Sequence, residues 1–268
     1  MATKAVKAGH DWEVAGAAWG HSPADWACFY EQYSLDVMVA LFLRLGVGPG
    51  VDLLDVACGS GLLAHTAAGC GCRVSGIDAA APLLDIARAR TPEADLRLGS
   101  MFDLPWDDAS FDVVVSMNGI WGDCEGALAE MRRVVRPTGK VAIAFWGRDT
   151  PLDMRALYLA MIPYLPQHEV DGLRTNNNIA KDGVAEAMLE AAGFTVVDRG
   201  RRVSMVEWPD PDTAWRAMAS SGPIVEALNH PDRDGLRRDL LAAIEHTRDA
   251  NGIYRYRNDH RFVIAQPA

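Results

Sequence analysis

The chain has 268 residues, of which 49% are hydrophobic and 23% are charged, the balance of an ordinary soluble protein that can bury a substantial core. Its formal net charge of −10 argues against a nucleic-acid partner, because proteins that follow a phosphate backbone carry a surplus of Lys and Arg. We therefore expect a small-molecule partner and no nucleic acid.

No part of the sequence indicates export, a membrane or a metal. Residues 1–10 include lysines but no apolar stretch typical of a secretion signal, and no run of 18 apolar residues occurs. The five cysteines form no Cys-x-x-Cys pair, and Cys70-Gly71-Cys72 has no further ligand at metal-finger spacing. We expect a cytoplasmic protein with free thiols, no metal and no membrane association.

Residues 1–50 are predicted to form a helical cap. Ser22-Pro23-Ala24-Asp25 is typical of a helix start, with Ser at the N-cap, Pro in the first turn and an acid at the third position. The apolar residues that follow recur at steps of three and four, which predicts a helix packed on the edge of a sheet. They are Trp26, Phe29, Tyr30, Tyr33, Val37, Leu41 and Leu45.

The stretch 51–61 predicts a cofactor site. It starts as an apolar run with Asp55 near its end, the pattern of a strand buried on both faces, and Gly59 and Gly61 then allow a tight turn before a helix. A strand, a glycine turn and a helix N-terminus direct backbone N–H groups at a nucleotide-like ligand. The string Gly59-x-Gly61-x-x-Ala64 also fits the relaxed dinucleotide fingerprint, a pattern too common to decide the cofactor alone.

Residues 51–150 alternate strands and helices, which predicts a doubly wound, mostly parallel sheet with its ligand-binding loops on one rim. Asp78 follows the second apolar run, where an acid commonly accepts hydrogen bonds from the two ribose hydroxyls. The predicted strands lie near 51–56, 73–77, 95–98, 111–117 and 141–146, and the helices near 61–69, 82–90 and 125–135.

The motif Asp55-Val56-Ala57-Cys58-Gly59-Ser60-Gly61 resembles that of the class I S-adenosylmethionine-dependent methyltransferases, which have an acid, any residue and then Gly-x-Gly-x-Gly. Ala57 replaces the first glycine, so a positive φ there would strain the loop. Segment 99–106 is similar to the family's adenine loop, although Ser100 replaces the usual acid. Segments 110–118 and 132–140 complete four motifs in the family's order.

The resemblance implies a Rossmann-like seven-stranded sheet, S-adenosyl-L-methionine as cofactor and S-adenosyl-L-homocysteine as product. It also implies that Asn118, at the end of the fourth strand, faces the methionine part or the substrate, whereas a loop-capping role for that side chain is an equal alternative. The cofactor-binding residues expected on this basis are Asp55, Ala57, Cys58, Gly59, Gly61, Asp78, Ala79, Leu83, Ser100, Met101, Phe102 and Asn118.

Residues 151–268 are predicted to complete the sheet and to shape the substrate pocket within the same structural domain. The resemblance implies that the last two strands form an antiparallel edge, with inserted helices covering the pocket. We expect helices at 151–165, 181–192 and within 210–250, a polar mobile loop at 167–178, a β-rich run at 194–206 and a last strand at 261–265.

The substrate and the catalytic residues are harder to assign. None of the seven histidines lies in a recognisable motif, so each is expected to be exposed or structural, and no catalytic residue is assigned. Aromatic residues are expected to line an enclosed apolar pocket, although a core role is the commoner one for each. The candidates are Trp19, Tyr30, Tyr33, Trp121, Trp146 and Tyr158.

Three functions are compatible with these residues. The first is methyl transfer to O, N or C of a small apolar or aromatic molecule. The second is an NAD(P)-dependent oxidoreductase, which the missing Tyr-x-x-x-Lys pattern disfavours, and the third is a cofactor-binding protein without methyl transfer. A homodimer could form through the edge strand and the N-terminal helix.

Overall fold

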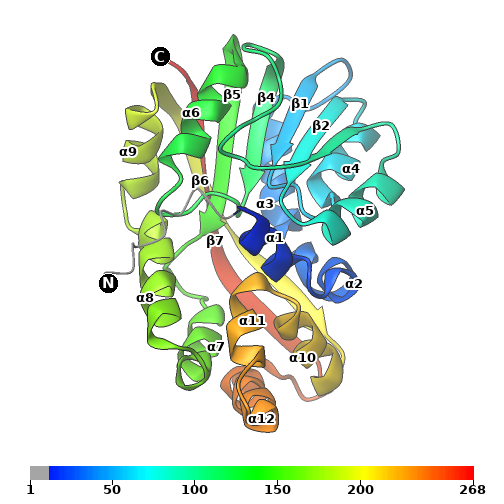
Figure 1. Cartoon of the computed structure of the whole chain (residues 1–268), viewed down its shortest axis with the longest axis vertical. Helices are drawn as coiled ribbons and strands as arrows, with labels where there is room; N and C mark the ends of the chain where they lie inside the picture. Colours follow the sequence, from blue (N-terminus) through cyan, green and yellow to red (C-terminus); the bar gives the residue numbers. More distant parts are fainter. Residues whose placement is uncertain (1–11) are drawn as a thin grey trace, which may run out of the picture.

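A seven-stranded sheet in the order β3-β2-β1-β4-β5-β7-β6 forms the centre of the molecule (Figure 1). The computed structural model describes residues 12–268, apart from the side chains of 172–177, so the predictions for residues 1–10 lie outside it. The first five strands are parallel, and β7 runs antiparallel to both β5 and β6. The strands are β1 (Asp52–Val56), β2 (Arg73–Asp78), β3 (Asp95–Leu98), β4 (Phe111–Met117), β5 (Val135–Trp146), β6 (Phe194–Trp208) and β7 (Tyr254–Pro267).

Helices cover both faces of this sheet, which confirms the predicted doubly wound fold. One face packs against α3 (Leu35–Leu45), α4 (Leu62–Gly69) and α5 (Ala81–Arg90), around apolar side chains such as Leu53 and Val115. The other face packs against α6 (Glu125–Val134) and α9 (Val184–Ala191), around Val114 and Ile143. The apolar runs of β1 and β4 follow from this double burial.

The N-terminal helix differs from the single predicted one. It divides into α2 (Pro23–Asp25), the π-helical segment η1 (Trp26–Tyr30), the 3-10 segment η2 (Glu31–Ser34) and α3. Ser22 lies at the predicted cap position but makes no side-chain capping bond. Of the predicted apolar stripe, Phe29 alone is only half-buried.

Two predictions for the second half of the chain are wrong. The segment predicted as a mobile loop forms the helix α8 (Gln167–Asn176) and the 3-10 segment η4 (Asn177–Ala180), because its polar residues sit on a short helix where periodicity gives little signal. The last strand extends from Tyr254 to Pro267, far beyond 261–265. Its polar first half pairs with the end of β6, beginning with Tyr254 opposite Trp208.

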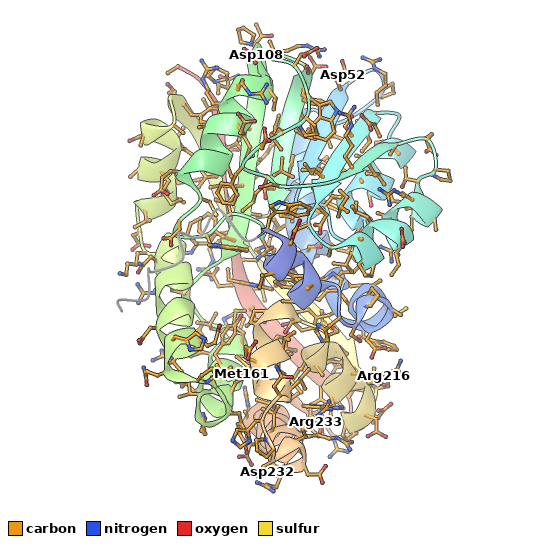
Figure 2. All side chains as sticks on the ribbon, viewed as in Figure 1. Asp52, Asp108, Met161, Arg216, Asp232 and Arg233 are labelled. Atoms are coloured by element: carbon orange, nitrogen blue, oxygen red, sulfur yellow. The ribbon has the colours of Figure 1, made fainter. Side chains whose placement is uncertain are left out.

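The long β6 and β7 extend beyond the other five strands into a second, helical half of the molecule (Figure 1). This half contains α7 (Met154–Met161), α10 (Pro211–Ala219), α11 (Val225–Leu228) and α12 (Arg233–Ile244). Asp52, the first residue of β1, lies at the opposite end of the molecule from Met161 and Arg216 (Figure 2). The carboxyl ends of the parallel strands therefore face the helical half. Among the described residues, no helix is both long and apolar enough to cross a membrane.

Candidate cofactor and substrate site

Asp78 organises the glycine turn that follows β1. Its Oδ2 accepts a hydrogen bond from the Gly59 backbone N–H at 2.7 Å, and its Oδ1 accepts one from the Ala80 N–H at 2.8 Å. Burial raises the pKa of this carboxyl, and the backbone donors oppose that shift. The Ala79 backbone also donates to this carboxyl, which leaves acceptor capacity on the carboxylate for a ligand hydroxyl, as the ribose assignment requires.

The turn itself has a left-handed backbone at three positions. Ala57, Gly59 and Gly61 have φ angles of 60°, 54° and 79°. A side chain at position 61 would lie 2.7 Å from the Cβ of Ala87, so only glycine fits there. The replacement of the family's first glycine by Ala57 therefore leaves a strained residue in the loop, as the sequence predicted for a positive φ.

Asp55, at the end of β1, is a buried acid with a spare acceptor. Its side chain is 1% exposed, and its Oδ2 has no hydrogen-bond partner. Burial, and then the nearby Asp78, raise the pKa of this carboxyl to about 8. Cys58 is buried beside it, and burial raises the pKa of its thiol.

The loop after β3 is held by α6. The Arg133 guanidinium donates to the backbone oxygens of Leu104 and Trp106 at 2.8 and 2.7 Å, and Glu130 accepts from the Leu104 N–H at 2.8 Å. Ser100 Oγ accepts from the Phe102 N–H at 3.2 Å. Met101 and Phe102 are partly buried against the core, so the predicted adenine loop has a defined shape.

Asn118 and the buried His260 form a polar pair that sequence reasoning missed. Asn118 follows β4 with a φ of 61°, and its Oδ1 lies 2.9 Å from His260 Nε2. His260 is 0% exposed, and burial lowers the pKa of its imidazole to about 3, so the ring is neutral. His260 pairs with Trp146 across β5 and β7, a register that no local motif reveals.

A cavity of about 360 Å³ lies between the carboxyl ends of the strands and the helical half. Rings line much of it: Tyr33 and Trp146 have centroids 4.6 Å apart, and the Tyr30 and Tyr33 centroids are 5.6 Å apart. Asn118 and Ile120 also reach its wall from the end of β4. The structure brings all six predicted aromatic candidates to this one cavity, namely Trp19, Tyr30, Tyr33, Trp121, Trp146 and Tyr158.

The phenols of this cavity stay protonated at neutral pH. Burial raises the pKa of Tyr158 to about 12 and moves the pKa values of Tyr30 and Tyr33 in the same direction. Their hydroxyls can therefore donate hydrogen bonds to an acceptor molecule but are poor bases. Sequence reasoning could find the aromatic residues but not this shared burial.

The helix α1 (Trp12–Trp19) contacts both the loop after β2 and the cavity. A Cβ at Gly16 would lie 2.0 Å from the carbonyl oxygen of Ala79, so the helix packs directly on the loop after β2. Trp19, at its other end, packs against Gly222 and lines the cavity. Leu83, in contrast, is only 2% exposed and packs into the core of the helical half, so its predicted contact with the cofactor has little surface available.

A doubly wound sheet with a glycine turn, an acid at the end of β2 and an adjoining aromatic cavity has the layout of a protein that binds a nucleoside-type cofactor beside a small molecule. The predicted rim residues fit S-adenosylmethionine: Asp78 can take its ribose, and the unpartnered Oδ2 of Asp55 is an acceptor near the glycine turn.

Comparisons with known proteins agree with this class. Residues 54–143 match the family model for a methyltransferase domain. The chain is 34% identical over 116 residues to the demethylmenaquinone methyltransferase of Renibacterium salmoninarum, an overlap of 42% of this chain and 49% of that protein. The chain spans about half the length of the curated relatives that it matches.

Solved structures share the fold over most of the chain. The YcgJ protein of Bacillus subtilis superposes with a TM-score of 0.59 at 15% identity, over 87% of this chain and 99% of that one. The [4+2]-cyclase SpnF superposes with a TM-score of 0.58 at 17% identity, over 97% and 95% of the two chains. Residues 54–143 therefore form a methyltransferase domain, for which S-adenosylmethionine is the cofactor, and the chain shares its fold with these solved structures.

Proposed function

We propose that the protein transfers a methyl group from S-adenosylmethionine to a small apolar or aromatic molecule held in the cavity. The observation that carries this proposal is the position of Asn118, which follows the cofactor-binding strands and also lines the aromatic cavity. The demethylmenaquinone methyltransferase relative, whose name describes a small-molecule substrate, supports the same reading.

When bound, S-adenosylmethionine would supply a methyl group on a positively charged sulfur, with a neutral thioether as the leaving group. In-line displacement then requires mainly alignment and exclusion of water. Asp78 and the glycine turn hold the nucleoside end, and Asn118 marks the boundary between the two sites. The hydroxyls of Tyr30 and Tyr158 orient the acceptor, and α1 with Trp19 excludes solvent.

The cavity wall supports an apolar or aromatic acceptor. Its remaining surface is largely Met, Leu and Ile, contributed by α7, by η4 and by the segments around α10 and α11, and Glu169 of α8 is an acid in this wall. A volume of about 360 Å³ lies at the lower end of the range for small-molecule pockets. A single-ring or short isoprenoid-like compound is therefore the class to test first.

Methyl transfer is tested with S-adenosylmethionine and a panel of such compounds, by measuring acceptor-dependent release of S-adenosylhomocysteine. Trp146→Phe should reduce acceptor-dependent turnover because it alters the cavity wall. The matched control is Trp215→Phe, which changes a tryptophan of the helical core that does not line the cavity. Product release that does not depend on any acceptor would contradict the proposal.

A cytoplasmic location and a homodimer are two further parts of the proposal. All five cysteines are free thiols, as suits a reducing compartment. The outer face of α3 exposes Leu35, Val39 and Leu43, with Leu43 81% exposed, and α3 packs beside the edge strand β6. This apolar face supports a dimer contact, which light scattering on the purified protein tests.

A further inference from the structure

Glu31 is a buried carboxylate that joins two parts of the molecule distant in sequence. It is 6% exposed; its Oε2 accepts a hydrogen bond from Ser60 Oγ, and its Oε1 lies 2.7 Å from Arg90 Nη1. Burial raises the pKa of the Glu31 carboxyl, and Ser60 and Arg90 oppose that shift. An acid this deeply buried is costly unless its partners compensate, so its position calls for an explanation beyond stability.

Its partner Ser60 is the central residue of the glycine turn. Arg90 Nη1 also donates to the Ser60 backbone oxygen at 3.0 Å, and Arg90 Nη2 donates to the Ala27 oxygen at 3.4 Å. Asp78 therefore holds one side of the turn through Gly59, whereas Glu31 and Arg90 hold the other side. The turn is fixed in part by the N-terminal cap.

The same cap segment forms part of the cavity wall. The helix changes from π-helical in η1 to 3-10 between Tyr30 and Glu31, and such irregularities are frequent at functional sites. The change lets Tyr30 and Tyr33 line the cavity while Glu31, between them in sequence, reaches Ser60. Tyr33 in turn packs on Trp146, 4.6 Å away between ring centroids.

We infer that Glu31 is a positioning residue that couples the cofactor turn to the acceptor cavity. Binding of the cofactor to the turn fixes Ser60, and the Ser60–Glu31 contact then fixes Tyr30 and Tyr33 in the wall that receives the acceptor. This inference rests on the proposed function, because it takes the turn as the cofactor site and the cavity as the acceptor site. It adds an order of events, with the cofactor preparing the acceptor wall.

The test is hydrogen exchange of the full chain, followed by mass spectrometry, with and without saturating S-adenosylhomocysteine. In the wild type, the ligand should slow exchange in two peptides, the turn at 57–63 and the cap at 27–34, each by about tenfold. Ser60→Ala removes only the hydroxyl, so the response of the turn should remain while that of the cap falls by about half or more.

Two substitutions of Glu31 separate positioning from a general loss of structure. Glu31→Gln keeps an oxygen that accepts from Ser60 and should retain most of the cap response, whereas Glu31→Met keeps the length of the side chain but not the acceptor and should lose it. The control is Asp25→Asn, which breaks a different cap contact, the 2.6 Å pair with Arg216, and should leave the response unchanged.

The outcomes distinguish this inference from the function on which it rests. A cap that responds equally in the wild type, Ser60→Ala and Glu31→Met overturns the coupling but leaves the cofactor site intact, as does a wild-type cap that does not respond. If S-adenosylhomocysteine does not bind the wild type at all, both the proposed function and the coupling fail.

Discussion

His260 on β7 and Asn118 after β4 meet at 2.9 Å between Nε2 and Oδ1, where Asn118 reaches the wall of the aromatic cavity. The imidazole also packs on the Trp146 ring, with centroids 4.7 Å apart. Because burial keeps His260 neutral, Nε2–H can donate to the Asn118 oxygen, and the amide nitrogen of Asn118 is then left to donate toward a ligand.

This burial makes the stability of the protein sensitive to acid. The pKa of His260 is lowered from 6.5 to about 3 in the folded state. The stabilisation of the fold by the neutral imidazole is therefore complete above pH 6.5 and is lost as the pH falls toward 3. His260→Gln cannot ionise, so its free energy of unfolding should fall by about 2 kcal/mol less than that of the wild type between pH 7 and pH 5. Urea unfolding at the two pH values measures this. The exposed His168→Gln should behave like the wild type; if it matched His260→Gln, the assignment would be wrong.

Asp55 should have the opposite pH dependence. Its folded pKa is raised from 3.8 to about 8, so its favourable contribution is present below pH 4 and is lost as the pH rises through 8. Asp55→Asn removes the ionising group, and its gain in Tm over the cofactor-free wild type should grow between pH 5 and pH 8. A gain in Tm that stays constant over this pH range would contradict a raised pKa for the Asp55 carboxyl.

Ala57 allows a test of loop strain. Its φ of 60° costs an L-residue about 1–2 kcal/mol, whereas glycine adopts this angle freely. Ala57→Gly restores the family's glycine and should raise the free energy of unfolding by about 0.5–1 kcal/mol after the added chain entropy is counted. Ala67→Gly, at a buried position within α4, should instead lower it by more than about 1 kcal/mol, because lost burial of the methyl group adds to the lower helix propensity of glycine. Denaturant titration of the two variants measures both values.

Asp78 should dominate cofactor affinity. Asp78→Ala removes the acceptor for the ribose hydroxyls and the support of Gly59, so the Kd for S-adenosylhomocysteine should rise more than about tenfold. The control Asp85→Asn changes an exposed acid on α5, 76% exposed, and should leave the Kd unchanged. Equal affinity in Asp78→Ala and the wild type would rule out Asp78 as the acceptor for the ribose hydroxyls.

Ser100 is the position where the chain departs from the class I methyltransferase pattern in the predicted adenine loop. Ser100→Asp places a carboxylate where the family has one, and that carboxylate can still accept from the Phe102 N–H. Affinity for S-adenosylhomocysteine, measured by calorimetry, should hold or increase. A large loss would mean that the loop does not face the adenine.

The sequence predicted the parts of the fold that depend on local signals. Buried strands such as β4 are nearly continuous apolar runs, and the turn at Gly59 requires particular residues, so both could be located without a structure. The polar half of β7 could not, because pairing with β6 determines it, and the helix α8 could not, because its polar residues carry little periodic signal.

The same limit applies to the site. Asp78 ends β2 and Asn118 follows β4, so both were predicted as site residues from their position at the strand ends. The aromatic residues were predicted as candidates for a pocket wall. The contact of Glu31 with Ser60 joins residues 29 positions apart, and that of His260 with Asn118 joins residues 142 apart. No motif carries such pairs, since they arise only when the cap and the last strand close on the rim.

The most direct test of this account is calorimetric titration of the purified chain with S-adenosylhomocysteine, S-adenosylmethionine and, in parallel, NADH. We expect micromolar binding of the first two and no binding of NADH, which would justify a search for the acceptor with labelled methyl donor. Binding of NADH alone would contradict it and would return Gly59-x-Gly61-x-x-Ala64 to its dinucleotide meaning.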